Sequence, residues 1–99
     1  MASEFEWDAT KATQNLKDHG VPFAEALTVF ADPLARIFDD PDHSKGERRE
    51  LIIGHSARQR LLIVSFTERG RRTRIISARK TTKSERRDYE ENLKESTSG

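Results

Sequence analysis

The first third of the chain spaces its apolar residues as α-helices do. Residues 8–19 place Ala and Leu side chains on one narrow face, which predicts a helix that is capped by Asp8 and ends before Gly20. Pro22 suits the first turn of a second helix, which residues 32–33 (DP) end. The apolar residues of this second helix follow i, i+3, i+4, i+7 spacing: Phe23, Ala26, Leu27 and Phe30.

After residue 33 the pattern changes to short β-branched segments bounded by turn residues. The strands predicted there, in addition to a short strand predicted at residues 4–7 before the helices, are residues 34–38, 49–55, 60–67 and 72–78. Short turns join the last three of them and favour an antiparallel meander. Thr82 and Glu85 form a T-x-x-E capping box that starts a last helix, which we expect to end near Leu93. The predicted fold is therefore α+β: a short N-terminal strand, two helices, an antiparallel sheet of about four strands and a C-terminal helix.

Length and composition predict one cytoplasmic domain. Ninety-nine residues allow a single modest core, which we place within residues 4–94, with residues 95–99 as a flexible tail. The absence of cysteine fits a reducing compartment. The longest aliphatic run, residues 61–64, is too short to cross a membrane, and the acidic N-terminus lacks the apolar core of a signal peptide.

The net charge of +1 conceals two oppositely charged parts. Residues 58–87 hold eleven Lys and Arg against two acids, whereas the rest of the chain holds seven against fifteen. A field concentrated in this way attracts polyanions such as nucleic acid. The alternative is a solvated, arginine-rich surface with no ligand.

The motifs of the chain resemble those of the BrnT toxins. The family pattern of F-x-W-D, a Lys, an Asn, H-G, F-x-E-A and a closing D-P is similar to the opening stretch FEWDATKATQNLKDHGVPFAEALTVFADP. Further similar blocks follow in the same order: DPDHSKGERR, IGHS, LLIVSFTERG and RIISARKTTKSERRDYE. The resemblance runs from residue 4 to about residue 91, with Asp18 where the family more often has Lys.

This resemblance implies a RelE-like ribonuclease fold and a toxin that halts translation by cutting RNA, which could be ribosome-bound mRNA. It also implies neutralisation by a cognate BrnA-like antitoxin. Operator DNA would be bound by this antitoxin and not by the toxin itself. We expect the antitoxin to cover much of the basic sheet and the last helix, because this would occlude the positive field.

RNA cleavage without a metal or other cofactor needs a base, an acid and cations that stabilise the phosphorane. The candidate catalytic residues are Arg74, Arg79, Glu68, His55 and Tyr89. The candidate RNA-binding residues are Arg69, Arg71, Arg72, Lys80, Lys83 and Arg86. We expect folding to gather the guanidinium groups into one pocket shaped for a phosphodiester.

The spacing of Arg74 and Arg79 sets a condition on this site. Strict alternation along a strand places residues 74 and 79 on opposite faces of the sheet. Both can serve one site only if the strand ends or bulges near Ala78.

Several candidates have a structural alternative. Glu68 could be a general base or a charge partner of Arg71 or Arg74, and Tyr89 could stack on a base or dock the last helix together with Leu93. His55 is the histidine we would test as a general acid or base, whereas a capping or packing role is expected for His19.

The loop DDPDHSKGE at residues 39–47 is similar to a calcium-binding loop. Lys45 stands where that loop needs Gly, and Leu51 stands where it needs Glu. We therefore expect a solvated acidic loop around His43 and no metal site.

Two classes of function remain open on the sequence alone. One is an endoribonuclease acting through the basic face. The other is a non-catalytic nucleic-acid-binding module or translational regulator that uses the same face, because the sequence contains no unmistakable acid–base pair.

Overall fold

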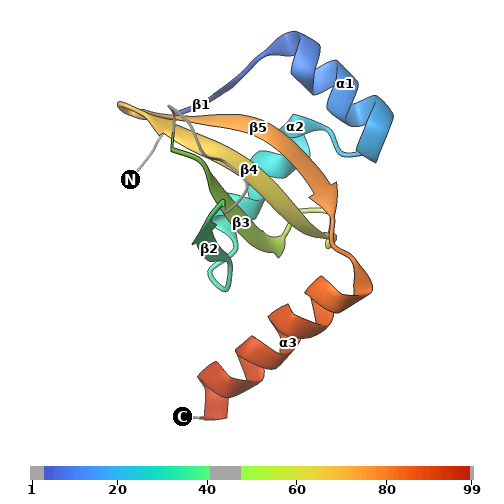
Figure 1. Ribbon diagram of the computed structural model, residues 1–99, viewed down its shortest axis with the longest axis vertical. Helices are drawn as coiled ribbons and strands as arrows, with labels where there is room; N and C mark the ends of the chain where they lie inside the picture. The colour runs from blue at the N-terminus through green and yellow to red at the C-terminus, as the bar shows by residue number, and fades with distance from the viewer. Residues whose placement is uncertain (1–3, 41–47, 99) are drawn as a thin grey trace.

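Five strands form one sheet, with helices packed on it (Figure 1). The computed structural model describes residues 4–40 and 48–98, with side chains up to residue 93. The elements are β1 (Glu4–Trp7), α1 (Ala9–His19), α2 (Phe23–Ala26), the 3₁₀ helix η1 (Leu27–Ala31), β2 (Arg36–Asp39), β3 (Glu50–His55), β4 (Leu61–Arg69), β5 (Arg72–Lys80) and α3 (Lys83–Ser98). The predicted α+β class is confirmed.

The strand order is β1-β5-β4-β3-β2, and one detail differs from the prediction. The strands β2 to β5 form the expected antiparallel meander, but β1 adds a fifth strand that runs parallel to β5, with Phe5 beside Thr73. Two interactions hold this short edge strand in place. Phe5 packs against Phe30 with ring centroids 5.1 Å apart, and the acidic residues of β1 face arginines of β5.

The first helix has the predicted cap and stop. The backbone N–H of Lys11 donates to Asp8 Oδ1 at 2.9 Å, and Gly20 ends the helix with a φ of 69°. The predicted second helix is instead a four-residue α-helix that tightens into η1. Such 3₁₀ turns are common as connectors, and Asp32 ends this one by donating its N–H to Val29 O.

The last helix begins with the predicted capping box. Glu85 N–H donates to Thr82 Oγ1 at 3.1 Å, while Thr82 N–H donates to Glu85 Oε1 at 2.8 Å. The helix continues to Ser98, past the predicted end at residue 93. Among the described residues, no helix combines the length and apolar character needed to cross a membrane.

The two faces of the sheet differ in their cover. We call the face under α1, α2 and η1 the helix-covered face. Its buried core is the following set: Val21, Phe23, Ala26, Val29, Ile52, Leu62, Val64, Phe66, Ile75 and Ala78. We call the other the open face, because α3 contacts it at one end only, where Tyr89 packs on Ile53 and Leu61. Functional groups on the remainder of the open face are therefore accessible.

Candidate functional site

A β-bulge determines which side chains of β5 reach the open face. Ser65 of β4 pairs with Ser77, whereas the next residue, Phe66, pairs with Ile75, so Ile76 is an extra residue in β5. The alternation restarts after it, and Arg74 and Arg79 consequently share the open face. The bulge that the spacing of these two arginines requires is therefore present, at Ile76 instead of the expected Ala78.

A hollow of about 270 Å³ lies on the open face, across β3, β4 and β5. Its apolar lining is Leu51, Ile63, Ile76 and Ala78, and its polar lining comes from separate parts of the chain: His19, Asp40, Arg49, Ser65, Ser77 and Arg79. Two guanidinium groups and an imidazole around one concave surface make a setting suited to a phosphate group.

His19 reaches the hollow because α1 is clamped to the free edge of β5. Beyond Ile75, no described strand pairs with that edge, and the side chain of Asn15 takes the place of one. Its amide donates to Ala78 O and Val21 O at 2.9 Å each and accepts from Ala78 N–H at 3.0 Å. His19 is the last residue of α1, so the clamp brings it to the hollow that Arg79 also lines.

The orientation of Arg79 is set by the start of α3. Its Nη1 and Nη2 donate to the two carboxylate oxygens of Glu85 at 2.8 and 2.9 Å, and Nη1 also donates to Lys80 O at 3.2 Å. This ion pair lowers the pKa of Glu85 to about 2 and raises the pKa of Arg79. The contacts use three of the five guanidinium N–H groups, which leaves two for a ligand in the hollow.

Arg49, which directly precedes β3, supplies the second guanidinium group. Its Nε is buried and has no hydrogen-bond partner among the described residues. A buried donor without an acceptor is costly, so this group is positioned to gain from an incoming anion.

Arg74 and Arg72 have carboxylate partners instead, because β1 lies beside them. Arg74 Nε is 3.2 Å from Glu6 Oε2, although its N–H does not point at that oxygen well enough to form a hydrogen bond. Arg72 contacts Glu4 at 3.2 Å and Glu6 at 3.3 Å. These ion pairs offset part of the positive charge at this end of the open face.

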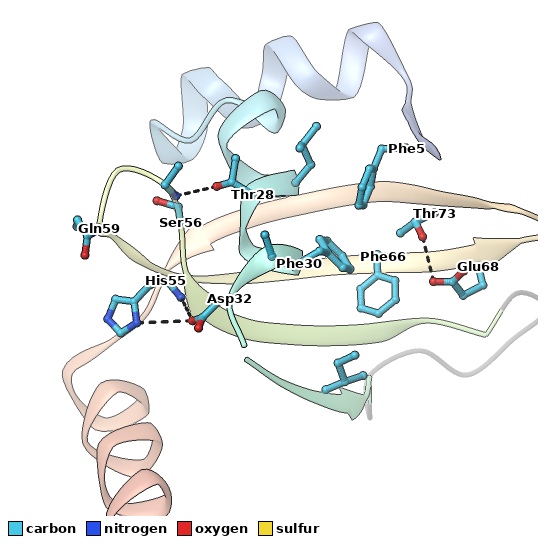
Figure 2. A pocket seen from close by; sticks show the side chains of 14 residues that line it. Phe5, Thr28, Phe30, Asp32, His55, Ser56, Gln59, Phe66, Glu68 and Thr73 are labelled. Atoms are coloured by element: carbon cyan, nitrogen blue, oxygen red, sulfur yellow. Dashed lines mark hydrogen bonds and ion pairs between the residues drawn. The ribbon is translucent and has the colours of Figure 1, made fainter. Parts of the chain in front are cut away.

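Glu68 and His55 line a different depression, a groove on the helix-covered side (Figure 2). Glu68 accepts a hydrogen bond from Thr73 at 3.1 Å and not from Arg71 or Arg74, the partners considered from sequence. His55 donates its backbone N–H to Asp32 Oδ2 at 2.7 Å, and its Nδ1 is 3.8 Å from the same oxygen.

Tyr89 is buried and docks α3, as the structural alternative for this residue requires. Its ring packs on Ile53 and Leu61 and lies edge-on to the ring of His55, with the ring centroids 5.8 Å apart. Burial is the main cause of the raised pKa of this tyrosine. A stacking role with an RNA base stays a prediction that the packing does not favour.

The structure does not gather the predicted cations into one pocket. Of the eleven predicted site residues, all in the described part of the chain, only Arg79 lines the hollow. Arg69, Arg71 and Arg72 lie at or beside the turn between β4 and β5, about 20 Å from Arg79 at 3.3 Å per residue. Two others lie on α3: Lys83 in its first turn, and Arg86, whose Nη1 is 3.9 Å from Glu90. Lys80 is exposed at the end of β5.

The predicted solvated loop without a metal site concerns residues that the structure describes only in part. His43 and most of the loop that carries it lie outside the described residues. Within the described residues, no group of three or more His, Asp or Glu side chains is placed to hold a metal ion.

The residues that sequence reasoning missed are His19, Asp40 and Arg49, which come from three segments far apart in the chain. The sequence does contain a signal for the Asn15 clamp, which positions His19. Asn15 follows Ala12 by three residues, so a polar side chain lies on the packing face of α1, where it needs a buried partner.

Comparisons with known proteins agree with this architecture. The profile of the family described as "Ribonuclease toxin, BrnT, of type II toxin-antitoxin system" matches residues 7–85. The crystal structure of the Brucella abortus ribonuclease toxin BrnT, solved at 1.1 Å resolution, has a similar fold, with a TM-score of 0.63 and 24% sequence identity. The match covers 81% of this chain and 97% of that one. No curated protein sequence matches the chain. The extent of the family match shows that this chain belongs to the BrnT family of ribonuclease toxins of type II toxin–antitoxin systems.

Proposed function

We propose that the chain is a metal-independent endoribonuclease whose active site is the hollow on the open face. The observation that carries this proposal is Arg49, which lines the hollow together with Arg79 and His19 and whose buried Nε has no hydrogen-bond partner among the described residues. Two guanidinium groups can hold the non-bridging oxygens of a phosphodiester and stabilise the charge that grows on them. The set of residues inferred from sequence is thereby revised, and of its members only Arg79 is kept in the catalytic role.

The reaction that fits these residues is an internal phosphoryl transfer within RNA. The 2′-oxygen attacks the neighbouring phosphorus, the bond from phosphorus to the 5′-oxygen breaks, and the products are a 2′,3′-cyclic phosphate and a 5′-hydroxyl. One group must accept the 2′-hydroxyl proton and another must protonate the leaving oxygen. The imidazole of His19 and the carboxylate of Asp40 are the groups in the hollow suited to general acid–base catalysis, and we assign the two transfers to them.

The hollow receives His19 from one edge of the sheet and Asp40 from the other. His19 is held beside β5 by the Asn15 clamp, whereas Asp40 follows β2 at the opposite edge and donates its backbone N–H to Arg49 O at 3.0 Å. Attacking and leaving oxygens lie on opposite sides of the phosphorus in such a reaction. An acid and a base that enter from opposite edges suit this geometry.

The cations outside the hollow have a supporting role in this proposal. Arg69, Arg71, Lys80, Lys83 and Arg86 extend the positive surface beyond the hollow, where they can contact the backbone phosphates of flanking nucleotides. RNA cleavage in the cytoplasm would stop protein synthesis, and a cognate BrnA-like antitoxin would neutralise the toxin. Family membership supports both statements.

Cleavage of a labelled RNA by the purified chain tests the proposal. The variants are Arg49→Ala, Arg79→Ala and His19→Gln, and the matched control is Arg58→Ala, which removes an exposed cation outside the hollow. We expect cleavage in the presence of EDTA, products with 2′,3′-cyclic phosphate ends, and a loss of at least 100-fold in each hollow variant but not in the control. His19→Gln should also remove one limb of a bell-shaped pH profile.

Other outcomes would decide against the proposal. Intact RNA at high protein concentration, with and without translating ribosomes, together with binding that weakens steeply with salt, would favour the non-catalytic nucleic-acid-binding module. Full activity of Arg49→Ala would place the active site elsewhere on the molecule.

A further inference from the structure

A long groove runs along the helix-covered side of the sheet, away from the proposed active site (Figure 2). It encloses about 880 Å³ between η1 and the strands. The floor is aromatic: the ring of Phe30 lies 5.1 Å from that of Phe5 and 5.0 Å from that of Phe66. On β2, the side chain of Ile37 lines the groove and is 55% exposed.

Such a surface is unusual for a protein that acts alone. An exposed isoleucine beside an aromatic-floored groove leaves apolar area in water, and patches of this kind mark sites where another molecule binds. The strand β2 is also the edge of the sheet, and within the described residues its outer side pairs with no other strand. This edge therefore leaves room for a partner beside Ile37.

The charges of the groove indicate what kind of partner it takes. No Lys or Arg is among the described residues that line it, whereas the carboxylates of Asp32 and Glu68 stand toward opposite ends (Figure 2). Asp32 lies over Gly54, which pairs with Leu62, and Glu68 is six residues further along β4. At 3.3 Å per residue, the two carboxylates are about 20 Å apart. An apolar floor between two acids disfavours RNA and favours an apolar segment with basic ends.

We propose that the groove is the docking site of the antitoxin, through an apolar segment flanked by Lys or Arg at both ends. A separation of about 20 Å corresponds to about 13 residues of helix or about six of extended chain. This inference rests on the proposed function, because it takes the existence of an antitoxin from the family. It places the contact on the side opposite the basic open face, which the sequence suggested as the surface that the antitoxin covers.

The test measures the affinity of purified antitoxin for toxin variants at the rim of the groove. Ile37→Arg removes the apolar contact and adds a charge that repels a basic segment, whereas Ile37→Asp removes the contact and adds an attractive charge. Glu68→Lys reverses the charge at one end. Leu16→Arg and Leu16→Asp are the matched controls, because Leu16 is 50% exposed on α1 and does not line the groove.

We expect Ile37→Arg to weaken antitoxin binding at least 100-fold, Ile37→Asp and Glu68→Lys each about tenfold, and both Leu16 variants less than twofold. RNA cleavage by Ile37→Arg should stay within twofold of wild type, so that loss of partner binding is separated from loss of the proposed ribonuclease activity. Thermal unfolding of each variant verifies that it is folded. If Ile37→Arg does not fold, the affinity of Glu68→Lys for the antitoxin provides the test.

Three results would overturn the proposal. The first is antitoxin affinity within twofold of wild type for both Ile37→Arg and Glu68→Lys. The second is loss of affinity confined to an Arg69/Arg74/Arg79 triple alanine variant, which would assign the contact to the open face. The third is a toxin dimer in the absence of antitoxin that Ile37→Arg dissociates, which would assign the groove to a second copy of this chain. A wild-type chain that binds the antitoxin normally but cleaves no RNA would count against the proposed function alone.

Discussion

Replacing Asn15 by Ala should destabilise the protein and displace the end of α1. Asn15 is 6% exposed, and its amide makes three hydrogen bonds to backbone groups of Val21 and Ala78 at 2.9 to 3.0 Å. Alanine can make none of them. The substitution would remove a partner from the carbonyl group of Val21 and from the N–H and carbonyl groups of Ala78, which lie at an edge of β5 that no other described strand covers.

The magnitude follows from these three groups. A buried N–H without an acceptor costs about 1–3 kcal/mol, and a carbonyl that loses one partner costs about 0.5–1.5 kcal/mol. We therefore expect the free energy of unfolding to fall by about 3 kcal/mol, which lowers the ratio of folded to unfolded molecules about 100-fold. His19 lies four residues further along α1, so RNA cleavage should fall more than RNA binding does.

Urea unfolding and amide hydrogen exchange measure the two parts of this prediction. The amide of Ala78 should exchange faster in Asn15→Ala, because its acceptor is gone. Gln14→Ala is the control, since Gln14 is exposed on the same helix and its side chain donates a hydrogen bond to Asp18 at 2.8 Å. The reasoning is refuted if Asn15→Ala costs less than about 1 kcal/mol or leaves the exchange of Ala78 unchanged.

Three further substitutions test an ion pair, a close approach of two segments and a left-handed backbone position. The ion pair with Arg79 lowers the pKa of Glu85 from 4.5 to about 2, so the stabilisation by this carboxylate is fully present above pH 4.5 and is lost as the pH falls through 2. Glu85→Gln should therefore cost about 1–2 kcal/mol at pH 7 and much less near pH 2, and equal costs in urea unfolding at both pH values would contradict this. Gly54→Ala should cost about 1–3 kcal/mol in thermal unfolding, because overpacking strains a closed site. Its new Cβ would lie 2.9 Å from the Cβ of Ala35, and an unchanged Tm would show that the site yields. Gln59 has a φ of 64°, so Gln59→Gly should raise the free energy of unfolding, and a lower value would mean that the side chain of Gln59 contributes to stability. The expected gain is about 0.5 kcal/mol, because relief of the left-handed conformation slightly exceeds the entropy cost of Gly.

Local features were predicted well because neighbouring residues determine them. The cap of α1 by Asp8, its end at Gly20 and the capping box of Thr82 and Glu85 all depend on residues within four positions of one another. The strands of the meander were also found, since β-branched residues separated by short turns indicate them directly.

The candidate site was predicted poorly because it depends on pairing between distant segments. The partner of β1 cannot be read from the sequence EFEW, yet its parallel pairing with β5 brings Glu4 and Glu6 to Arg72 and Arg74. Arg49 had no distinguishing sequence context and becomes notable only through its buried Nε. Sequence reasoning could thus identify a basic face but not which of its arginines share a concave surface.

The extra residue at Ile76 makes the site depend on the parity of a residue count. Deleting Ile76 would make the pairs Ser65–Ser77 and Phe66–Ile75 consecutive, and strict alternation would then keep Arg74 and Arg79 on the same face. Inserting one residue between the two arginines would instead turn the second half of β5 over, unless a second bulge absorbed it. The guanidinium group of Arg79 would then be driven into the apolar core, and the methyl group of Ala78 would face solvent. Exchanging one apolar side chain for another at position 76 keeps the parity, so an insertion in this stretch should be far less tolerated than a substitution or the loss of Ile76.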